Sequence, residues 1–385
     1  MESGKRRDEA VISKLSSLNS YVSIEIMKGN NILENLENCL QNDESKYDVV
    51  VITEFLPEDE AIKIDLFCRN NKIGFIYTAL LGIYGFCFVD FGDEFLIKDE
   101  NGEDPLSYCI KSISKEKKGI VKIDTTAGKI KLGNNDKVTF KEIEGMVELN
   151  NCDPINIKVL SNDTIEIGDT SNFSNYISGG VMTEVKSKKE LNFNSLEERL
   201  NMPYLENEQI PEQIDVSKYN TNEIIHIGIL ALNKFYKDKN IFPELNNKEH
   251  AKELIIYGKK IYESKKAEKI CWLEGLEEEF KNFYEILEKT LLRMLLWARA
   301  EISPLSSFLG GVSAQEILKF TGKYSPIHQW IWFDFSEIVE NLGENVNRNL
   351  KNSRYDDQIA IFGNEIQEKL NNSNIFLIGA GCFRM

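Results

Sequence analysis

The hydrophobic positions in the first hundred residues follow two periods, one typical of strands and one typical of helices. Residues 47–53 form a β-branched apolar run of the kind that is buried on both faces of a sheet. Pro57 begins an acidic helical stretch that continues to Cys68, and apolar strands are predicted at residues 72–78 and 85–91. Strand, helix and strand in this order favour a right-handed parallel crossover, so we expect an α/β sheet.

From about residue 118 the pattern changes to a short alternation of apolar and polar residues. Turn-forming residues at 133–136 and 161–163 separate the alternating segments. Short strands at a spacing of about ten residues predict a small β-barrel or sandwich, inserted between helical regions. The alternating segments are residues 121–123, 129–132, 137–140, 155–159 and 164–167.

Residues 196–300 have a helical period. Apolar residues recur at i, i+3 and i+4 from Ile224 to Phe235, and a long apolar stripe runs from Leu276 to Ala298. We interpret the stripes as the core of a four-helix bundle rather than as a cofactor site. His226 lies within one of these apolar helices, where a hydrogen-bonded core histidine is expected.

The α/β pattern resumes after Ser303 and Pro304. A helix is predicted at residues 312–320 and a strand at 329–334. A polar linker at residues 344–355 follows, and then a helix at 365–370 and a strand at 374–378. The fold class predicted from the whole pattern is therefore α/β, with an inserted β-domain and an inserted helical bundle.

The composition narrows the function classes. The chain has 385 residues and a formal net charge of −16, which argues against a nucleic-acid partner because phosphates repel an acidic surface. No apolar run approaches the roughly 20 residues needed to span a bilayer, and the charged N-terminus is not a signal peptide. The seven cysteines form no C-x-x-C pair, so neither a zinc ribbon nor a redox motif is indicated, and a reducing compartment is expected.

The last predicted strand leads into Gly379, Ala380 and Gly381, followed by Cys382. Glycines after a strand let the backbone approach a phosphate, and the next helix N-terminus adds partial positive charge. The third glycine and the helix are missing before Met385, so we expect a piece of a larger enzyme with an incomplete nucleotide loop. No motif for a catalytic residue or a metal site is present, and none is predicted.

A second candidate is the segment that follows the alternating strands. It is dense in turn and capping residues, which is typical of a loop, and a loop on a small β-domain can also be a recognition surface. These residues leave the two interpretations equally supported. The segment comprises Asp169, Thr170, Ser171, Asn172, Phe173 and Ser174.

Several blocks together resemble ubiquitin-activating enzymes (E1). Residues 145–150, 157–160 and 169–180 resemble the first catalytic-cysteine half-domain of that family. Further blocks resemble its inactive adenylation domain, its helical bundle and the start of its active adenylation domain. These blocks lie within residues 15–22, 82–92, 226–235, 308–316, 326–334 and 354–370, so the resemblance covers essentially the whole chain in order.

The resemblance implies adenylation of ubiquitin with Mg-ATP, capture as a cysteine thioester, and transfer to a conjugating enzyme. In the family the Mg-ATP site and the nucleophilic cysteine lie downstream of the glycine loop, and the first strands lie upstream of Met1. The resemblance therefore implies no catalytic cysteine here, a structural role for Arg354, and no ATP or Mg bound to this piece. After Gly381 the family continues differently from Cys382, Phe383 and Arg384, which suggests a truncation or a gene-model error near the end.

The resemblance also predicts the domain boundaries and the partners. The inactive adenylation domain would comprise residues 1–115 and 301–345, the β half-domain 116–192, the four-helix bundle 193–300, and the start of the active adenylation domain 346–385. We expect ubiquitin as partner, a cytoplasmic and nuclear location, and self-association through the truncated sheet. The alternatives are an E1 for another modifier, a non-catalytic ubiquitin-binding module, and a nucleotide-dependent oxidoreductase suggested by the terminal glycines alone.

Overall fold

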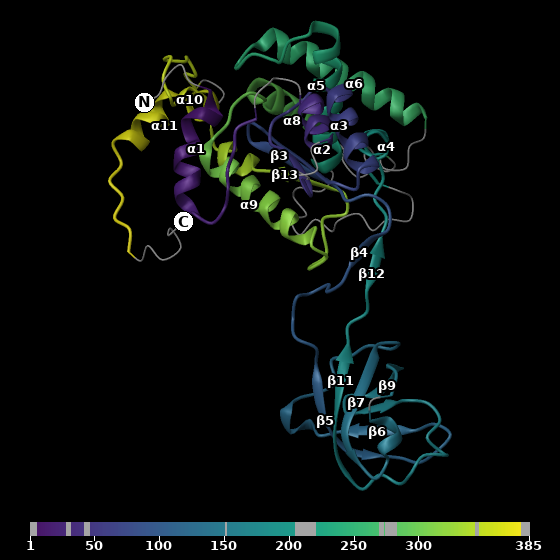
Figure 1. Ribbon diagram of the computed structural model, residues 1–385. Coiled ribbons are helices and arrows are strands. Elements are labelled where there is room, and N and C mark those ends of the chain that lie inside the picture. The colour runs from purple at the N-terminus through teal and green to yellow at the C-terminus, as the bar shows by residue number, and fades with distance from the viewer. Residues whose placement is uncertain are drawn as a thin grey trace. The chain divides into compact units, whose positions relative to one another are not determined.

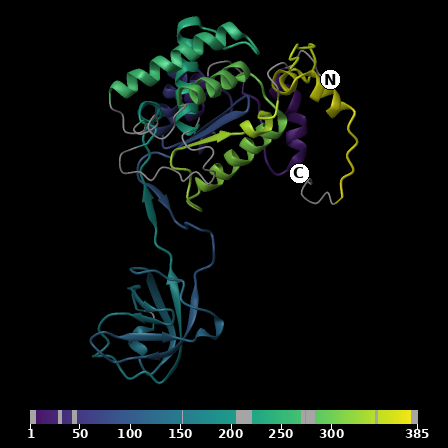
Figure 2. The ribbon, with the colours of Figure 1, turned by 180° about the vertical axis from the view of Figure 1, so that it is seen from behind.

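The computed structural model describes residues 6–27, 32–41, 47–150, 152–204, 221–268, 273, 283–342 and 346–378. The chain divides into two compact units, each with its own hydrophobic core (Figure 1; Figure 2). The first unit contains Met1–Gly92, Phe193–Ile317 and Ile327–Met385, and the second contains Asp93–Asn192 and Leu318–Pro326. No helix in the described ranges is both long and apolar enough to cross a membrane.

The first unit is built on a four-stranded sheet of β1 (Val49–Ile52), β2 (Gly74–Leu81), β3 (Tyr84–Asp90) and β13 (Trp330–Asp334), in that order. β1 and β2 are parallel and are joined by α3 (Glu58–Asn70), which confirms the predicted crossover. β2 and β3 form an antiparallel hairpin, and β13 is antiparallel to β3, so the sheet is mixed. Gly82 makes the hairpin turn with a φ of +70°, and a Cβ there would lie 2.7 Å from the Cβ of Trp297.

Long helices pack with this sheet around one continuous core. α5 (Thr221–Lys239), α6 (Lys248–Ala267) and α8 (Phe283–Trp297) pack against one another, as predicted for a helical bundle. His226 of α5 is fully buried, its Nε2 lies 2.9 Å from the Leu200 carbonyl oxygen, and its ring packs edge-on against Trp330. Burial lowers the pKa of His226 to about 4, so the ring is neutral, which confirms the expected core histidine.

The second unit is a nearly closed, barrel-like sheet of seven strands, in the order β8-β7-β11-β5-β6-β10-β9. The strands at the two ends of this order are separated in the sequence by Ile157 alone, so the sheet curls back on itself. The predicted inserted β-domain is confirmed. The bounds are β5 (Ser107–Ile113), β6 (Ile120–Ile123), β7 (Lys137–Glu144), β8 (Ile155–Asn156), β9 (Lys158–Ser161), β10 (Thr164–Glu166) and β11 (Ser178–Val185), with a separate ribbon of β4 (Phe95–Ile97) and β12 (Lys189–Leu191).

Six further α-helices are described, and all but the last two residues of α9 belong to the first unit. They are α1 (Arg7–Leu18), α2 (Ile32–Gln41), α4 (Leu196–Asn201), α9 (Ser303–Lys319), α10 (Asp356–Phe362) and α11 (Asn364–Asn371). The strand predicted at residues 374–378 is wrong, because this segment pairs with no strand in the described part of the chain. Ile375 and Phe376 are 88% and 89% exposed. An apolar run becomes a strand only when a neighbouring strand takes up its backbone hydrogen bonds.

Candidate functional site

The segment from Asp169 to Ser174 is an ordered loop between β10 and β11. Asp169 closes its first turn, because Oδ1 accepts hydrogen bonds from the backbone amide of Ser171 at 2.9 Å and from its hydroxyl at 2.6 Å. The Ser171 hydroxyl and then the Ser171 amide lower the pKa of Asp169, so this exposed carboxylate is charged at neutral pH. The capping chemistry seen in the sequence therefore acts within the loop.

Thr170 anchors this loop to the barrel and is only 1% exposed. Its hydroxyl donates to the Ser114 carbonyl oxygen at 2.7 Å and accepts from the Glu116 amide at 3.1 Å. Its own amide donates to the Glu116 carbonyl oxygen at 2.9 Å. The Thr170 side chain thus fixes its own loop to the segment that joins β5 and β6, and it is not accessible to a partner.

The rest of the loop is held by the turn that follows β7. Ser174 donates from its amide and its hydroxyl to Oε1 of Glu148, at 2.7 and 2.8 Å. Phe173 is half-buried and packs against the barrel core. The side chains that this anchoring leaves exposed are Asp169, Asn172 and Ser174.

Two exposed apolar side chains flank the loop and lie outside the predicted segment 169–174. Val147 is 57% exposed and Ile177 is 73% exposed. Both lie beside Gly145: the Val147 amide donates to the Gly145 carbonyl oxygen, and the Ile177 amide donates to the Glu144 carbonyl oxygen, each at 2.9 Å. The sequence offered one signal for this surface: Val147 is an apolar residue that stands two positions after Gly145 and next to the acidic Glu148.

We use the term loop surface for six exposed residues around the Gly145 turn and the 169–174 loop. Its centre is apolar and its rim carries carboxylates, of which Glu148 has a pKa lowered by its own backbone amide and then by the Ser174 hydroxyl. An apolar centre with an acidic rim fits a protein surface with an apolar patch surrounded by basic side chains. The loop surface comprises Glu144, Val147, Glu148, Asn172, Ser174 and Ile177.

The second predicted site is the incomplete nucleotide loop. Gly379, Ala380, Gly381 and Cys382 lie outside the described residues. Within the described ranges no cluster of three or more His, Cys, Asp or Glu side chains could hold a metal ion. Burial raises the pKa of the Cys68 thiol to about 12, the reverse of what a nucleophilic cysteine requires.

Two family models match the chain. Residues 116–186 match the ubiquitin-activating enzyme E1 FCCH domain, and residues 187–262 match the ubiquitin-activating enzyme E1 four-helix bundle. The first match contains the whole loop surface, and the second contains α5 and most of α6.

Longer relatives match over nearly the whole chain. The chain is 34% identical to ubiquitin-like modifier-activating enzyme 1 of Rattus norvegicus, over 98% of this chain and 34% of the relative. It is 37% identical to the enzyme of the same name from Dictyostelium discoideum, over 98% of this chain and 34% of the relative. Ubiquitin-like modifier-activating enzyme 7 of Mus musculus is 33% identical, over 98% and 36%. The chain therefore spans about a third of the length of these relatives.

Proposed function

The chain belongs to the ubiquitin-activating enzyme (E1) family, and we propose that it serves such an enzyme as scaffold and as part of the surface that faces ubiquitin. The whole enzyme would adenylate ubiquitin with Mg-ATP, carry it as a cysteine thioester and pass it to a conjugating enzyme. Adenylation provides a good leaving group, which a thiolate then displaces. The observation that carries the proposal is the match to the FCCH domain across the loop surface.

We propose that residues 1–115 and 301–345 form most of the inactive adenylation domain, in a partial Rossmann-like arrangement. The parallel crossover β1–α3–β2 supports this assignment, because such crossovers build doubly wound sheets. Residues 379–382 would begin the phosphate loop of the active adenylation domain, where ATP and Mg bind in the whole enzyme. We propose the domain boundaries 116–192 and 193–300 for the β half-domain and the bundle, and a cytoplasmic and nuclear location.

The loop surface would contact ubiquitin weakly by itself. Titration of 15N-labelled ubiquitin with the full chain should give saturable shifts, and Ile177→Asp should reduce the affinity about 10-fold or more, since it places a charge at the apolar centre. Leu160→Asp, at an exposed apolar position on β9 of the same barrel, is the matched control and should leave the affinity unchanged. Equal affinities for both variants would remove the loop surface from the proposal.

The chain would lack adenylation activity of its own. Purified chain with ubiquitin, ATP and Mg should give no ATP–pyrophosphate exchange, and measurable exchange would refute this part. An E1 for another modifier is the second candidate, because the similar enzymes 1 and 7 are both named as activating ubiquitin-like modifiers. Parallel titrations with ubiquitin and with other ubiquitin-like proteins distinguish the two.

We also propose that copies of the chain associate through uncovered apolar segments. The segment that supports this proposal contains the exposed apolar residues Ile375, Phe376 and Ile378. Sedimentation should show concentration-dependent association that Phe376→Asp weakens. A monomer at all concentrations would contradict this.

A further inference from the structure

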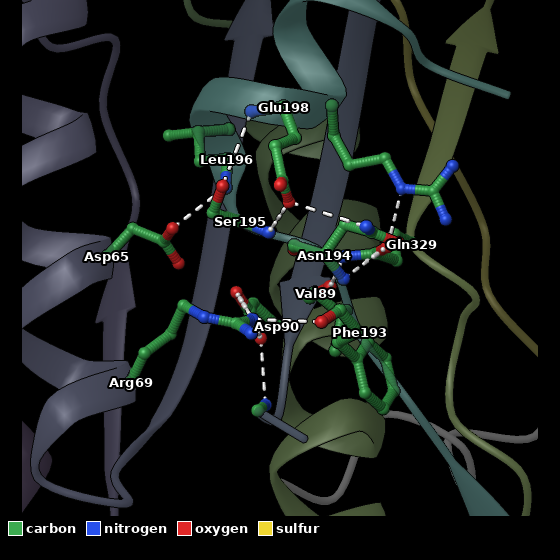
Figure 3. A network of polar contacts seen from close by, with 12 residues as sticks. Asp65, Arg69, Val89, Asp90, Phe193, Asn194, Ser195, Leu196, Glu198 and Gln329 are labelled. Atoms are coloured by element: carbon green, nitrogen blue, oxygen red, sulfur yellow. Dashed lines mark hydrogen bonds and ion pairs between the residues drawn. The ribbon is translucent and has the colours of Figure 1, made fainter. Parts of the chain in front are cut away.

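The chain leaves the first unit at Gly92 and returns to it at Phe193, and one buried polar network holds both crossings (Figure 3). The Phe193 amide donates to the Gly92 carbonyl oxygen at 3.2 Å. The Gly92 amide donates to Oδ1 of Asp90 at 2.7 Å, and the Leu196 amide, at the start of α4, donates to Oδ2 of Asp65 at 2.7 Å. One aspartate therefore binds the outgoing segment and the other binds the returning segment.

One arginine pairs with Asp90 and also acts on Asp65 through its charge. Asp65 and Arg69 lie one helical turn apart on α3, and Asp90 ends β3. Nη1 of Arg69 lies 2.8 Å and 2.6 Å from the two oxygens of Asp90 and donates to the Phe193 carbonyl oxygen at 3.0 Å. Asp65 is 0% exposed and Asp90 is 1% exposed, so both carboxyl groups are removed from water. Two buried negative charges beside one guanidinium would leave one charge uncompensated.

The geometry indicates where a proton would relieve this imbalance. No donor among the described residues reaches Oδ1 of Asp65, which points toward the Asp90 carboxylate (Figure 3). A protonated Asp65 could donate through this oxygen to Asp90 and still accept the Leu196 amide through Oδ2. A buried acceptor without a donor, facing a second carboxyl group, is the arrangement in which two carboxyls hold one proton.

We infer that Asp65 and Asp90 form a proton-dependent latch that fastens the two crossings of the inserted domain to the sheet. At neutral pH the pair carries one proton and one negative charge, which Arg69 balances. At alkaline pH the proton leaves to solvent, the two carboxylates repel each other, and the hold on Gly92, Phe193 and Leu196 weakens.

The surrounding groups are consistent with this assignment. Burial and then the Asp90 charge raise the pKa of Asp65 to about 8, and burial also raises the pKa of Asp90 against the lowering effect of Arg69. Other titratable groups nearby are the Cys68 thiol on α3, which stays protonated, and Glu198 on α4, whose pKa is lowered mainly by the Ser195 amide. The buried Arg199 on α4 donates from Nε to Oε1 of Gln329 at 2.5 Å, and Arg69 is the cation that donates hydrogen bonds to the pair, at Asp90.

A pH titration of the full chain by NMR tests the latch. The Asp65 carboxyl carbon should titrate near pH 8 rather than near 3.8, and the Leu196 amide should shift with the same midpoint. Asp65→Asn keeps an acceptor for Leu196 and a permanent donor toward Asp90, so its Leu196 amide should stay flat across that range. Asp124→Asn, at an exposed aspartate of the barrel, is the control and should behave as the parent chain.

Two results would overturn the inference. One is an Asp65 carboxyl that titrates in the ordinary range of aspartates. The other is a Leu196 midpoint that persists in Asp65→Asn, since it would then belong to a different group. If the variant fails to fold, the carboxyl titration of the parent chain still decides the question.

Discussion

Gly145→Ala tests whether the loop surface depends on a close approach of two backbone segments. Gly145 has a φ of +90°, a conformation that residues with a Cβ rarely adopt. A Cβ at this position would contact the Asn175 carbonyl oxygen and would lie 2.7 Å from Cγ1 and 2.8 Å from the amide nitrogen of Ile177. The substitution therefore adds backbone strain and steric overlap at the centre of the loop surface.

Gly168→Ala separates these two costs. Gly168 has a φ of +94°, almost the same as Gly145, but a Cβ there would meet nothing within 4 Å. Its cost should be the backbone strain, about 1–2 kcal/mol. Gly145→Ala should cost a further 1–3 kcal/mol, roughly the range for overpacking, because two of the overlapping atoms belong to the backbone and cannot rotate away.

Native-state hydrogen exchange of the full chain measures the difference. Amides of β7 and β11 should open about 5-fold to 150-fold more often in Gly145→Ala than in Gly168→Ala, the equivalent of 1–3 kcal/mol. Amides of β2 and β3, in the other unit, serve as an internal reference and should not change. Equal exchange in the two variants would refute the steric reasoning, and no change in either would refute the backbone argument as well.

Three further changes follow from the contacts described. Thr170→Val should destabilise the barrel by about 1–3 kcal/mol, because the Glu116 amide and the Ser114 carbonyl lose their partner. Hydrogen exchange at the β5–β6 hairpin measures this loss. The control Ser107→Ala, at an exposed hydroxyl pair, should change the stability by no more than about 0.5 kcal/mol. His226 has a lowered pKa, so the unfolded chain binds a proton that the folded chain does not. Stability should therefore fall by about 3 kcal/mol in total as pH drops from about 6.5 to about 4. In denaturant titrations His226→Gln should lose this dependence of stability on pH, and an unchanged dependence would assign it to other groups. Asp65 has a raised pKa, so its contribution to stability is complete below about pH 4 and is lost as pH rises toward about 8; Asp65→Asn should flatten the unfolding free energy across that window, and a parallel curve would contradict the assignment.

The local pattern predicted the elements better than their pairing. The β-branched run at β1 and the acidic start of α3 predicted a parallel crossover, which forms. The hairpin of β2 and β3 depends on Gly82 and on the space beside Trp297, which lies more than two hundred residues away in the sequence. The helix predicted at residues 312–320 begins earlier, at Ser303, because Pro304 suits the first turn of a helix and Gly310 and Gly311 lie inside it in open space.

The candidate site was predictable in position but not in detail. Turn and capping residues indicated the loop that begins at Asp169, and the structure holds that loop by those side chains. The burial of Thr170 depends on a hairpin more than fifty residues earlier, so no local pattern could reveal it. Asp65 and Asp90 likewise lie on different elements, and only the folded sheet brings their carboxyl groups together.

The hydrogen bond between Gly92 and Phe193 has a consequence for gene architecture. Gly92 and Phe193 have one hundred residues between them and lie 3.2 Å apart, nitrogen to oxygen, so the segment between them can be exchanged for a turn without stretching the backbone. Such sites tolerate insertion and excision, since the host strand and helix keep their own ends in place. The β-domain therefore has the connection expected of an insertion that can be exchanged as one unit. Recombination could replace residues 93–192 with another module while the sheet that receives it keeps its strand order.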